Sequence, residues 1–385
     1  MRFFHLADLH IGKKVNGYSM IDDQKIILDH IIECIENEKP DAIILAGDIY
    51  DRRNPPIEAV SLFDEFVSRV ILNLHVPILA IGGNHDGGER LGFANAIQAE
   101  AGLHLVGNFT WPIPVVRLMD EAGPVDFYLM SYADLPILHT IVPETVAMDY
   151  AEAMDWILSH TDIDRNARNV LIAHGVVIGE EGIETCDSER ILSIGGSESW
   201  SSDSLKMFDY VALGHLHQAQ RSGSDSIRYA GSLMQYSFSE ENHVKVMLDV
   251  SIDANGKLKI NSIPLKSPRK LVTVKGNLEN LLKVPEEIEP NRNDYLRVIL
   301  EDEGALIEPM QRLKSCYPNI MLLERANVPT MQNELFRLDI TGEKKNMSPM
   351  ELFVSFYQLM NESEPSQEMY SIMQEVFEQV QRESI

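Results

Sequence analysis

Five short apolar runs constrain the fold of this chain more than any other feature of its sequence. They cover residues 3–7, 42–46, 78–81, 170–173 and 210–213. Runs of this length and composition are typical of strands that are buried on both faces of a sheet. Helical patterns, for example at residues 22–36 and 57–72, alternate with the runs. Up to about residue 264, the sequence therefore predicts a layered α/β domain.

The side chains that directly follow the five runs are the candidate functional residues. Ligands of open α/β sheets bind outside the carboxyl ends of the strands, so we expect these side chains to meet at one edge. Glycines beside most of them let the backbone turn sharply and approach an ion closely. The candidate metal ligands are Asp8, His10, Asp48, Asn84, His174, His215 and His217.

The chemistry of these donors indicates a pair of metal ions. Two carboxylates, one amide and four imidazoles are too many for one tetrahedral ion and fit two ions of higher coordination. Mixed oxygen and nitrogen donors without thiolate suit Mn, Fe or Zn better than Mg or Ca. Two ions about 3.5–4 Å apart would hold a hydroxide nucleophile and neutralise phosphoryl oxygens. The predicted reaction is phosphoester hydrolysis.

Each motif alone has an ordinary explanation. An Asp-x-His after a strand is usually a loop end, Gly-His-x-His could be a single zinc site, and Gly-Asn-His-Asp could be a turn. Five such motifs in one chain, each after an apolar run, favour a single site. The other histidines, such as His30, His75 and His139, stand alone in helix or loop patterns, and we interpret them as structural or surface residues.

Together the motifs resemble the calcineurin-like metallophosphoesterase superfamily, whose pattern is Asp-x-His, Gly-Asp-x-x-Asp, Gly-Asn-His-Asp, His and Gly-His-x-His. A closer resemblance is to the SbcD family of bacterial nuclease subunits, which is related to double-strand-break repair nucleases of archaea and eukaryotes. Residues 5–13, 47–60 and 83–91 carry it, with a later signature at 229–240. One departure is Leu233, which stands where proline is expected after Gly-Ser and puts the local loop geometry in question.

The resemblance implies a fold and individual roles. The fold is a β-sandwich flanked by helices, with a small α+β capping domain. His85 would stabilise developing charge or protonate the leaving oxygen, and Asp86 would orient His85 or stabilise a turn. Asp51 would orient a ligand or cap the following helix. The first ion would be held by Asp8, His10, Asp48 and His217, and the second by Asp48, Asn84, His174 and His215, with Asp48 shared.

Changes of pattern along the chain predict three parts. Residues 1–265 form the metallophosphoesterase domain, and residues 266–341 form the small α+β unit, which the resemblance identifies as a capping domain that contacts DNA. Residues 342–385 show two amphipathic helical patterns, the first opened by a capping box at 348–351. These helices either dock on another protein or pack on their own domain.

The charge of the chain bears on its partners. A net charge of −26 argues against a protein that grips nucleic acid by bulk charge alone. The stretch 257–275 has six basic residues and no acid, and either faces a phosphate backbone or is a solvated linker. No phosphate-binding loop of an ATPase is present in the sequence. The resemblance implies an SbcC-like coiled-coil ATPase as partner, and also a homodimer.

The remaining features of the sequence concern location and function. No membrane span or signal peptide is recognisable, and three widely spaced cysteines fit a reducing compartment, so we expect a cytoplasmic protein. The leading hypothesis is a Mn²⁺-dependent exonuclease and endonuclease of DNA repair, recombination and replication. It would act on double-strand ends, hairpins and single strands. The alternatives are a phosphatase or small-molecule phosphodiesterase, disfavoured by Arg53 and Asp86 where phosphatases have glycine and glutamate, and a non-catalytic scaffold.

Overall fold

The computed structural model describes residues 1–143, 145–146, 149–189, 198–283, 292–302, 306–326, 350, 353–354, 357 and 364–383. The chain divides into two compact units, each considered by itself below. The first comprises Met1–Val274, Pro285–Arg297 and Lys314–Leu322, and the second comprises Lys275–Val284, Val298–Leu313 and Leu323–Ile385.

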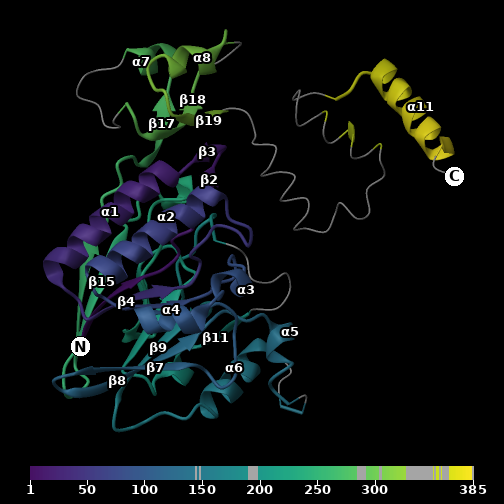
Figure 1. Cartoon of the computed structure of the whole chain (residues 1–385). Helices are drawn as coiled ribbons and strands as arrows, with labels where there is room; N and C mark the ends of the chain where they lie inside the picture. The colour runs from purple at the N-terminus through teal and green to yellow at the C-terminus, as the bar shows by residue number, and fades with distance from the viewer. Residues whose placement is uncertain are drawn as a thin grey trace. The chain divides into compact units, whose positions relative to one another are not determined.

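The first unit is built on two six-stranded sheets (Figure 1). In order across the first sheet, the strands are β16 (Leu258–Pro264), β15 (Val246–Ile252), β1 (Arg2–Leu6), β4 (Ala42–Ala46), β5 (Ile78–Ile81) and β6 (Leu103–Val106). Across the second they are β13 (Gln220–Ser222), β14 (Ser224–Tyr229), β12 (Tyr210–Gly214), β9 (Arg168–His174), β8 (Gly123–Met130) and β7 (Val115–Asp120). Strands β1, β4, β5 and β6 run parallel, as do β8, β9, β12 and β14.

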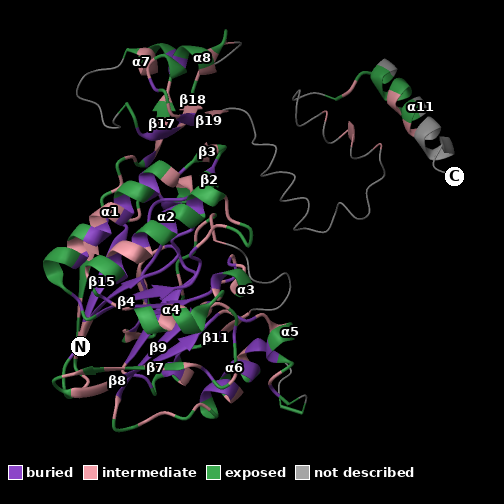
Figure 2. Cartoon of the chain, viewed as in Figure 1, coloured by how far each residue is buried: buried purple, intermediate pink, exposed green. Residues whose placement is uncertain are grey.

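Alternation along the central strands explains why the two sheets stack. In β4, Ala42, Ile44 and Ala46 belong to a core shared with strands of the second sheet. Ile43 and Leu45 belong to a different core, which the helices cover. Because side chains of a strand alternate between its faces, a strand that is apolar throughout needs an apolar layer on each side. The five predicted strands are confirmed, and their buried faces form the interior of the unit (Figure 2).

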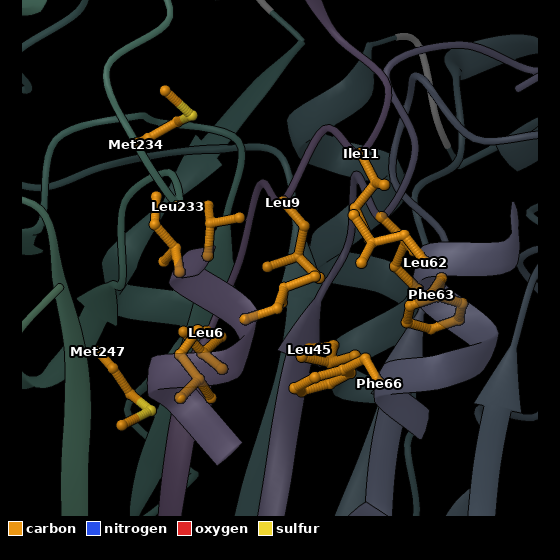
Figure 3. Packing of buried hydrophobic residues seen from close by; sticks show 14 of the residues in the cluster. Leu6, Leu9, Ile11, Leu45, Leu62, Phe63, Phe66, Leu233, Met234 and Met247 are labelled. Atoms are coloured by element: carbon orange, nitrogen blue, oxygen red, sulfur yellow. The ribbon is translucent and has the colours of Figure 1, made fainter. Parts of the chain in front are cut away.

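Helices cover the outer face of each sheet and complete four layers. Helices α1 (Ile21–Glu38) and α2 (Ile57–Ser68) cover the first sheet, and Figure 3 shows Phe66 of α2 beside Leu45. Helices α5 (Leu135–Leu138) and α6 (Tyr150–Ser159) cover the second sheet. The helix predicted at 57–72 ends at Ser68 and continues as a wider π turn, η1 (Arg69–Asn73).

Shorter elements connect these layers. They are β2 (Lys14–Val15), β3 (Tyr18–Ser19), α3 (Gly88–Leu91), α4 (Asn95–Ala101), β10 (Val176–Ile178), β11 (Ser199–Ser201), η2 (Ser202–Leu205) and η3 (Phe238–Glu240). Strands β10 and β11 pair in parallel, and β2 and β3 form a small antiparallel pair.

The α+β pattern predicted after residue 266 is present. Strands β17 (Leu271–Gly276), β18 (Tyr295–Leu300) and β19 (Ile320–Arg325) form a three-stranded sheet, with helices α7 (Leu278–Leu282) and α8 (Pro309–Lys314) in the connections. Helix α8 is shorter than the predicted 306–316, and it begins at a proline, a residue favoured in the first helical turn. The predicted three-part division stays a prediction.

Helix α11 (Gln367–Glu383) confirms the second amphipathic pattern near the end of the chain. The first pattern, at 348–360, lies mostly outside the described residues. Within the described ranges, no helix combines the length and the apolar character needed to cross a membrane.

Candidate metal centre

The five strands that precede the candidate ligands belong to both sheets of the first unit. Strands β1, β4 and β5 lie in the first sheet, and β9 and β12 lie in the second, so the site is shared between two sheets rather than built at the edge of one. Two hydrogen bonds join the two sets of strand ends. His174 Nδ1 donates to the carbonyl of Ala46 at 2.9 Å, and the backbone N–H of His215 donates to the carboxylate of Asp8 at 2.9 Å.

The backbone after β1 and β4 is held in an uncommon conformation. Asp8, His10 and Asp48 have φ values of 50°, 44° and 49°, and such left-handed backbone is unusual for residues other than glycine. The two loops hydrogen-bond to each other: Asp8 N–H donates to Gly47 O at 3.1 Å and His10 N–H to Asp48 O at 2.9 Å. Strained backbone of this kind is concentrated at functional sites. These hydrogen bonds hold together the two loops that carry the three candidate ligands.

Gly83 allows the loop after β5 to approach Asp48. A Cβ atom at position 83 would lie 2.2 Å from Asp48 Oδ1 and 2.4 Å from the Asp48 backbone nitrogen. No side chain fits in that space, so glycine is required for the close approach. Asn84 and His85, which follow directly, are thereby placed beside the Asp48 carboxylate.

The structure brings the ligands proposed for the first ion together. Asp8, His10 and His217 are buried and offer ligand atoms within 4.8 Å of one another. The Nε2 atoms of His10 and His217 face each other at 3.1 Å. Asp48 Oδ2 lies 3.7 Å from His10 Nε2.

The ligands proposed for the second ion also converge. Asp48 and His174 form a second buried group with ligand atoms within 4.8 Å, and this group also includes Asp8, which the resemblance assigns to the first ion. His174 Nε2 lies 2.9 Å from Asn84 Oδ1 and 3.5 Å from Asp48 Oδ2. His215 Nδ1 lies 3.4 Å from Asn84 Oδ1. Asp48 is therefore near both sets, as a shared ligand must be.

The donors fit divalent metal ions. The seven side chains supply carboxylate oxygens, an amide oxygen and imidazole nitrogens, and all seven are at most 5 % exposed. A cation bound among these donors would offset the cost of burying their lone pairs away from water. No thiolate is part of the set, which is the donor chemistry of Mn, Fe or Zn sites with mixed ligands.

The pKa values of the buried groups agree with this arrangement. Burial lowers the pKa of His215 to about 3, and it also lowers the pKa of His10, so both rings are neutral as metal ligands must be. Burial by itself would raise the pKa of Asp48, but His174 and His10 outweigh it and hold the pKa well below its usual range. Burial lowers the pKa of His174, but the Asp48 carboxylate more than offsets this and raises it to about 9, so without metal this ring carries a proton that a bound ion would displace.

His85 lies beside the clusters and is only half-buried. Its Nδ1–H donates to the carbonyl of Asp51 at 2.9 Å, and its backbone N–H donates to Asp48 Oδ1 at 2.8 Å. Its ring centroid lies 4.8 Å from that of His10. With Nδ1 anchored, Nε2 is the ring nitrogen left to exchange a proton with a substrate.

Asp86 and Asp51 have contacts that bear on their predicted roles. The Asp86 carboxylate accepts hydrogen bonds from the backbone of Ile49 at 3.1 Å, Tyr50 at 2.9 Å and Gly83 at 2.9 Å, which ties the loops after β4 and β5 together. These contacts match the turn-stabilising alternative, and a role through His85 stays a prediction. Asp51 pairs with Lys13 at 2.8 Å and lies 4.0 Å from His10 Nδ1. It does not cap α2, whose N-cap is Pro56 and lacks a side-chain cap.

Sequence reasoning missed a layer of polar residues behind the ligands. Gln24, fully buried on α1, donates to the carbonyl of His10 at 2.8 Å and accepts from Gly12 N–H at 3.0 Å. Tyr236 donates to the carbonyl of Leu9. A glutamine on the buried face of an amphipathic helix was the available signal for Gln24. Ser188 and Glu240, beside His217, gave no signal that assigns them a role.

Leu233, the departure noted in the sequence, is explained by its surroundings. Its side chain is 1 % exposed and packs in the core with Leu6 and Leu9 (Figure 3). Its backbone N–H donates to the carbonyl of Asp8 at 3.4 Å. Proline has no N–H and could not make this bond. The loop therefore keeps a contact to the ligand Asp8 that depends on a residue other than proline.

Two known protein families match this chain, one over its N-terminal part and one over its C-terminal part. The calcineurin-like phosphoesterase family matches residues 1–219, which include all seven candidate ligands and His85. The family described as Type 5 capsule protein repressor C-terminal domain matches residues 267–361.

A relative matches the chain over nearly its whole length. The chain is 34% identical over 372 residues to the SbcD component of the nuclease SbcCD from Staphylococcus epidermidis, covering 95% of each protein. Among solved structures, it is similar to a dimetal phosphatase from Danio rerio (12% identity, 69% of this chain and 99% of that one, TM-score 0.39). A phosphopantetheinyl hydrolase from Mycobacterium tuberculosis shows 17% identity over 60% of this chain and 88% of that one, with TM-score 0.32. Neither structural likeness reaches a TM-score of 0.5, and the assignment does not depend on them.

Proposed function

Because this chain belongs to the calcineurin-like phosphoesterase family, and within it to the SbcD nuclease subunits, we propose that it cuts DNA with two divalent ions. It is a metal-dependent phosphodiester hydrolase, a nuclease of the SbcCD type. The observation that carries the proposal is the convergence of seven buried donors, with Asp48 Oδ2 at 3.7 Å from His10 Nε2 and 3.5 Å from His174 Nε2.

The ligand residues have distinct parts in the proposed chemistry. His10 and His217 would hold the first ion with Asp8, and Asn84, His174 and His215 the second, with Asp48 between them. The bound ions would supply a nucleophile at neutral pH and neutralise the charge on the phosphoryl oxygens. Mn²⁺ is the metal we propose, with Mg²⁺, Fe and Zn as alternatives.

His85 would act on the leaving group. Its anchored Nδ1 leaves Nε2 to donate a proton to the departing oxygen or to stabilise the charge that develops there. General acid catalysis by a positioned histidine contributes about 10²–10⁴-fold to a rate.

The proposed substrates are double-strand ends, hairpins and single-stranded DNA in repair and recombination. Within the basic stretch 257–275, Arg269 is engaged in an ion pair with the fully buried Asp23 and is not available to DNA. The five lysines of this stretch are exposed and could meet a phosphate backbone: Lys257, Lys259, Lys266, Lys270 and Lys275. We propose a cytoplasmic location.

A partner ATPase of the SbcC type would supply much of the affinity for DNA. The relative is named as one component of the SbcCD nuclease, which supports a partner for this chain. Helix α11 has apolar side chains that are exposed, including Ile372 at 55% and Val376 at 43%. Such a face is suited to a groove on another protein.

The partner proposal predicts a selective loss. Ile372→Asp should abolish capture by the chain's own SbcC-like partner in a pull-down while hydrolysis of bis-p-nitrophenyl phosphate stays within twofold of normal, ~0.4 kcal/mol or less. Unchanged capture would show that α11 is not the docking helix.

The decisive test of the function is cleavage of end-labelled single-stranded and hairpin DNA by the purified protein. Reactions with Mn²⁺, Mg²⁺ or chelator would be run beside His85→Ala. We expect Mn²⁺-dependent cutting that falls about 10²–10⁴-fold in the variant, with Mn²⁺ binding retained. Hydrolysis of bis-p-nitrophenyl phosphate without DNA cleavage, also when the ATPase partner is added, would favour a small-molecule phosphodiesterase. Mn²⁺ binding without either activity would favour a scaffold.

A further inference from the structure

His217 is held differently from the other imidazoles of the metal centre. His174 has its second ring nitrogen fixed by the carbonyl of Ala46. The buried Nδ1 of His10 has no hydrogen-bond partner in the described part of the chain. The Nδ1 of His217 instead lies 2.7 Å from the hydroxyl oxygen of Ser188 and 3.5 Å from Glu240 Oε1.

The charge of Glu240 is balanced behind the ring. Its side chain is fully buried, and one carboxylate oxygen accepts from the ammonium of Lys245, which is itself only 9 % exposed. Lys245 also donates to the backbone carbonyl of His217 at 2.8 Å and to the hydroxyl of Ser232 at 2.8 Å. A buried carboxylate that is paired in this way stays ionised and can only accept hydrogen bonds.

The negative charge of Glu240 determines which atom is the donor in each hydrogen bond between Glu240, Ser188 and His217. The Ser188 hydroxyl must donate to Glu240 Oε1, because the carboxylate has no proton to give. The Ser188 oxygen then accepts from His217 Nδ1–H. Because Nδ1 of His217 carries the proton, the lone pair is on Nε2, the atom that faces His10 Nε2.

The backbone of His217 is anchored as well. Its N–H donates to Glu189 Oε1 at 2.7 Å, from the same short segment that carries Ser188. Its carbonyl accepts from Lys245. The ring of His217 is therefore held by Ser188, and its main chain by Glu189 and Lys245.

We propose that Glu240, acting through Ser188 and balanced by Lys245, is a positioning residue that holds His217 in the tautomer and orientation needed to bind metal. The inference rests on the metal centre proposed above. Outer partners of metal-binding histidines orient the ring and raise its basicity, and their loss typically costs about 10–100-fold in metal affinity.

The test is calorimetric titration of the metal-free protein with Mn²⁺. Ser188→Ala breaks the connection and leaves the Glu240–Lys245 pair in place, so it serves as the main variant. We expect it to weaken one of the two Mn²⁺ affinities about 10-fold or more, and Glu240→Gln to do the same or more. Ser188→Thr keeps the hydroxyl and should retain the normal affinity.

Two controls separate positioning from general destabilisation. Ser226→Ala removes a hydroxyl of similar exposure whose hydrogen bond is to Ser224, and should bind Mn²⁺ normally. Asp23→Asn removes another fully buried carboxylate that is paired with a cation, and should lower the unfolding temperature without changing Mn²⁺ affinity.

The outcomes distinguish this inference from the proposed function. If wild type binds two Mn²⁺ ions and Ser188→Ala binds both within twofold of wild type, the positioning role is wrong and the metal centre stands. If wild type binds no Mn²⁺ with these residues intact, the metal centre fails and this inference fails with it. Equal weakening in Asp23→Asn and Ser188→Ala would also overturn the inference, because it would show a general effect of stability.

Discussion

The two sheets of the first unit contribute different kinds of candidate metal ligand and hold them by different means. From the first sheet come Asp8, His10, Asp48 and Asn84, which include every oxygen donor. Three of these four have positive φ near 50°, whereas among the candidate ligands from the second sheet only His215 has positive φ, at 106°. From the second sheet come only imidazoles: His174, the last residue of β9, and His215 and His217 just beyond β12.

The comparison indicates how each donor type is kept in place. A carboxylate or amide is short, so its position follows from the backbone that carries it, and the loops after β1 and β4 fix that backbone by bonding to each other. An imidazole can rotate and can carry its proton on either nitrogen, so a partner for the nitrogen that faces away from the metal fixes both its orientation and its tautomer. Ala46 serves His174 in this way, and Ser188 serves His217.

Asp48→Asn should have the largest effect, because this carboxylate of the first sheet lies near ligands of both ions. We expect Mn²⁺ affinity and phosphodiester hydrolysis to fall by more than about 100-fold. Loss of a residue that only hydrogen-bonds to a ligand costs at most about 100-fold, and loss of a ligand should cost more. The amide can still accept from His85 N–H, so folding should be kept. Calorimetric titration and a hydrolysis assay check this, with the exposed Asp41→Asn as control. Loss of only one ion, with the other bound normally, would show that Asp48 is not shared.

Gly83→Ala should have the next largest effect and tests whether backbone approach fixes the oxygen donors. The added Cβ would lie 2.2 Å from Asp48 Oδ1, so the carboxylate must move. We expect Mn²⁺ affinity to fall about 10–100-fold. Gly17→Ala, where no atom lies within 4 Å of the added Cβ, is the control and should bind Mn²⁺ normally despite its φ of 86°. Normal Mn²⁺ binding by Gly83→Ala would mean that the loop can yield without displacing Asp48.

His5→Gln should have the smallest effect and probes the contact between the sheets away from the ions. The ring lies between the Tyr210 hydroxyl at 3.0 Å and the Leu213 carbonyl at 3.2 Å, both on β12, and burial lowers its pKa to about 3. The folded protein therefore keeps His5 neutral while the unfolded chain takes up a proton below about pH 6.5. Stability is lost as the pH falls from about 6.5 toward 3, by about 2 kcal/mol between pH 7 and pH 5.

Urea unfolding of the metal-free wild type and His5→Gln at pH 7 and pH 5 measures how much of the loss in stability is due to His5. The variant should lose about 2 kcal/mol less than wild type over the interval, since all other titrating groups are common to both proteins. An equal loss in the two proteins would show that His5 is protonated in the folded state or does not contribute.

Much of the fold, and the convergence of the candidate ligands, could be predicted from the sequence. The run 42–46 is β4 to the residue, and each of the seven candidate ligands lies in the buried cluster. Local composition is sufficient there, because an apolar run specifies a buried strand and a polar residue directly after it specifies a strand end. The end of α2 at Ser68, before a π turn, was not predictable, since the apolar pattern continues through Leu72.

By itself, the sequence determined the strands, the residues that follow them and therefore the donor chemistry, because these depend on neighbours along the chain. Only the tertiary structure decided that the strands divide between two sheets and that Asp48 lies near both groups of ligands. It also decided that Gln24, Ser188 and Glu240 support the ligands from behind. Such contacts join residues far apart in the sequence, 207 positions for His10 and His217, and depend on how whole layers pack. No local pattern encodes the distance between two segments that meet only after the sheets have stacked.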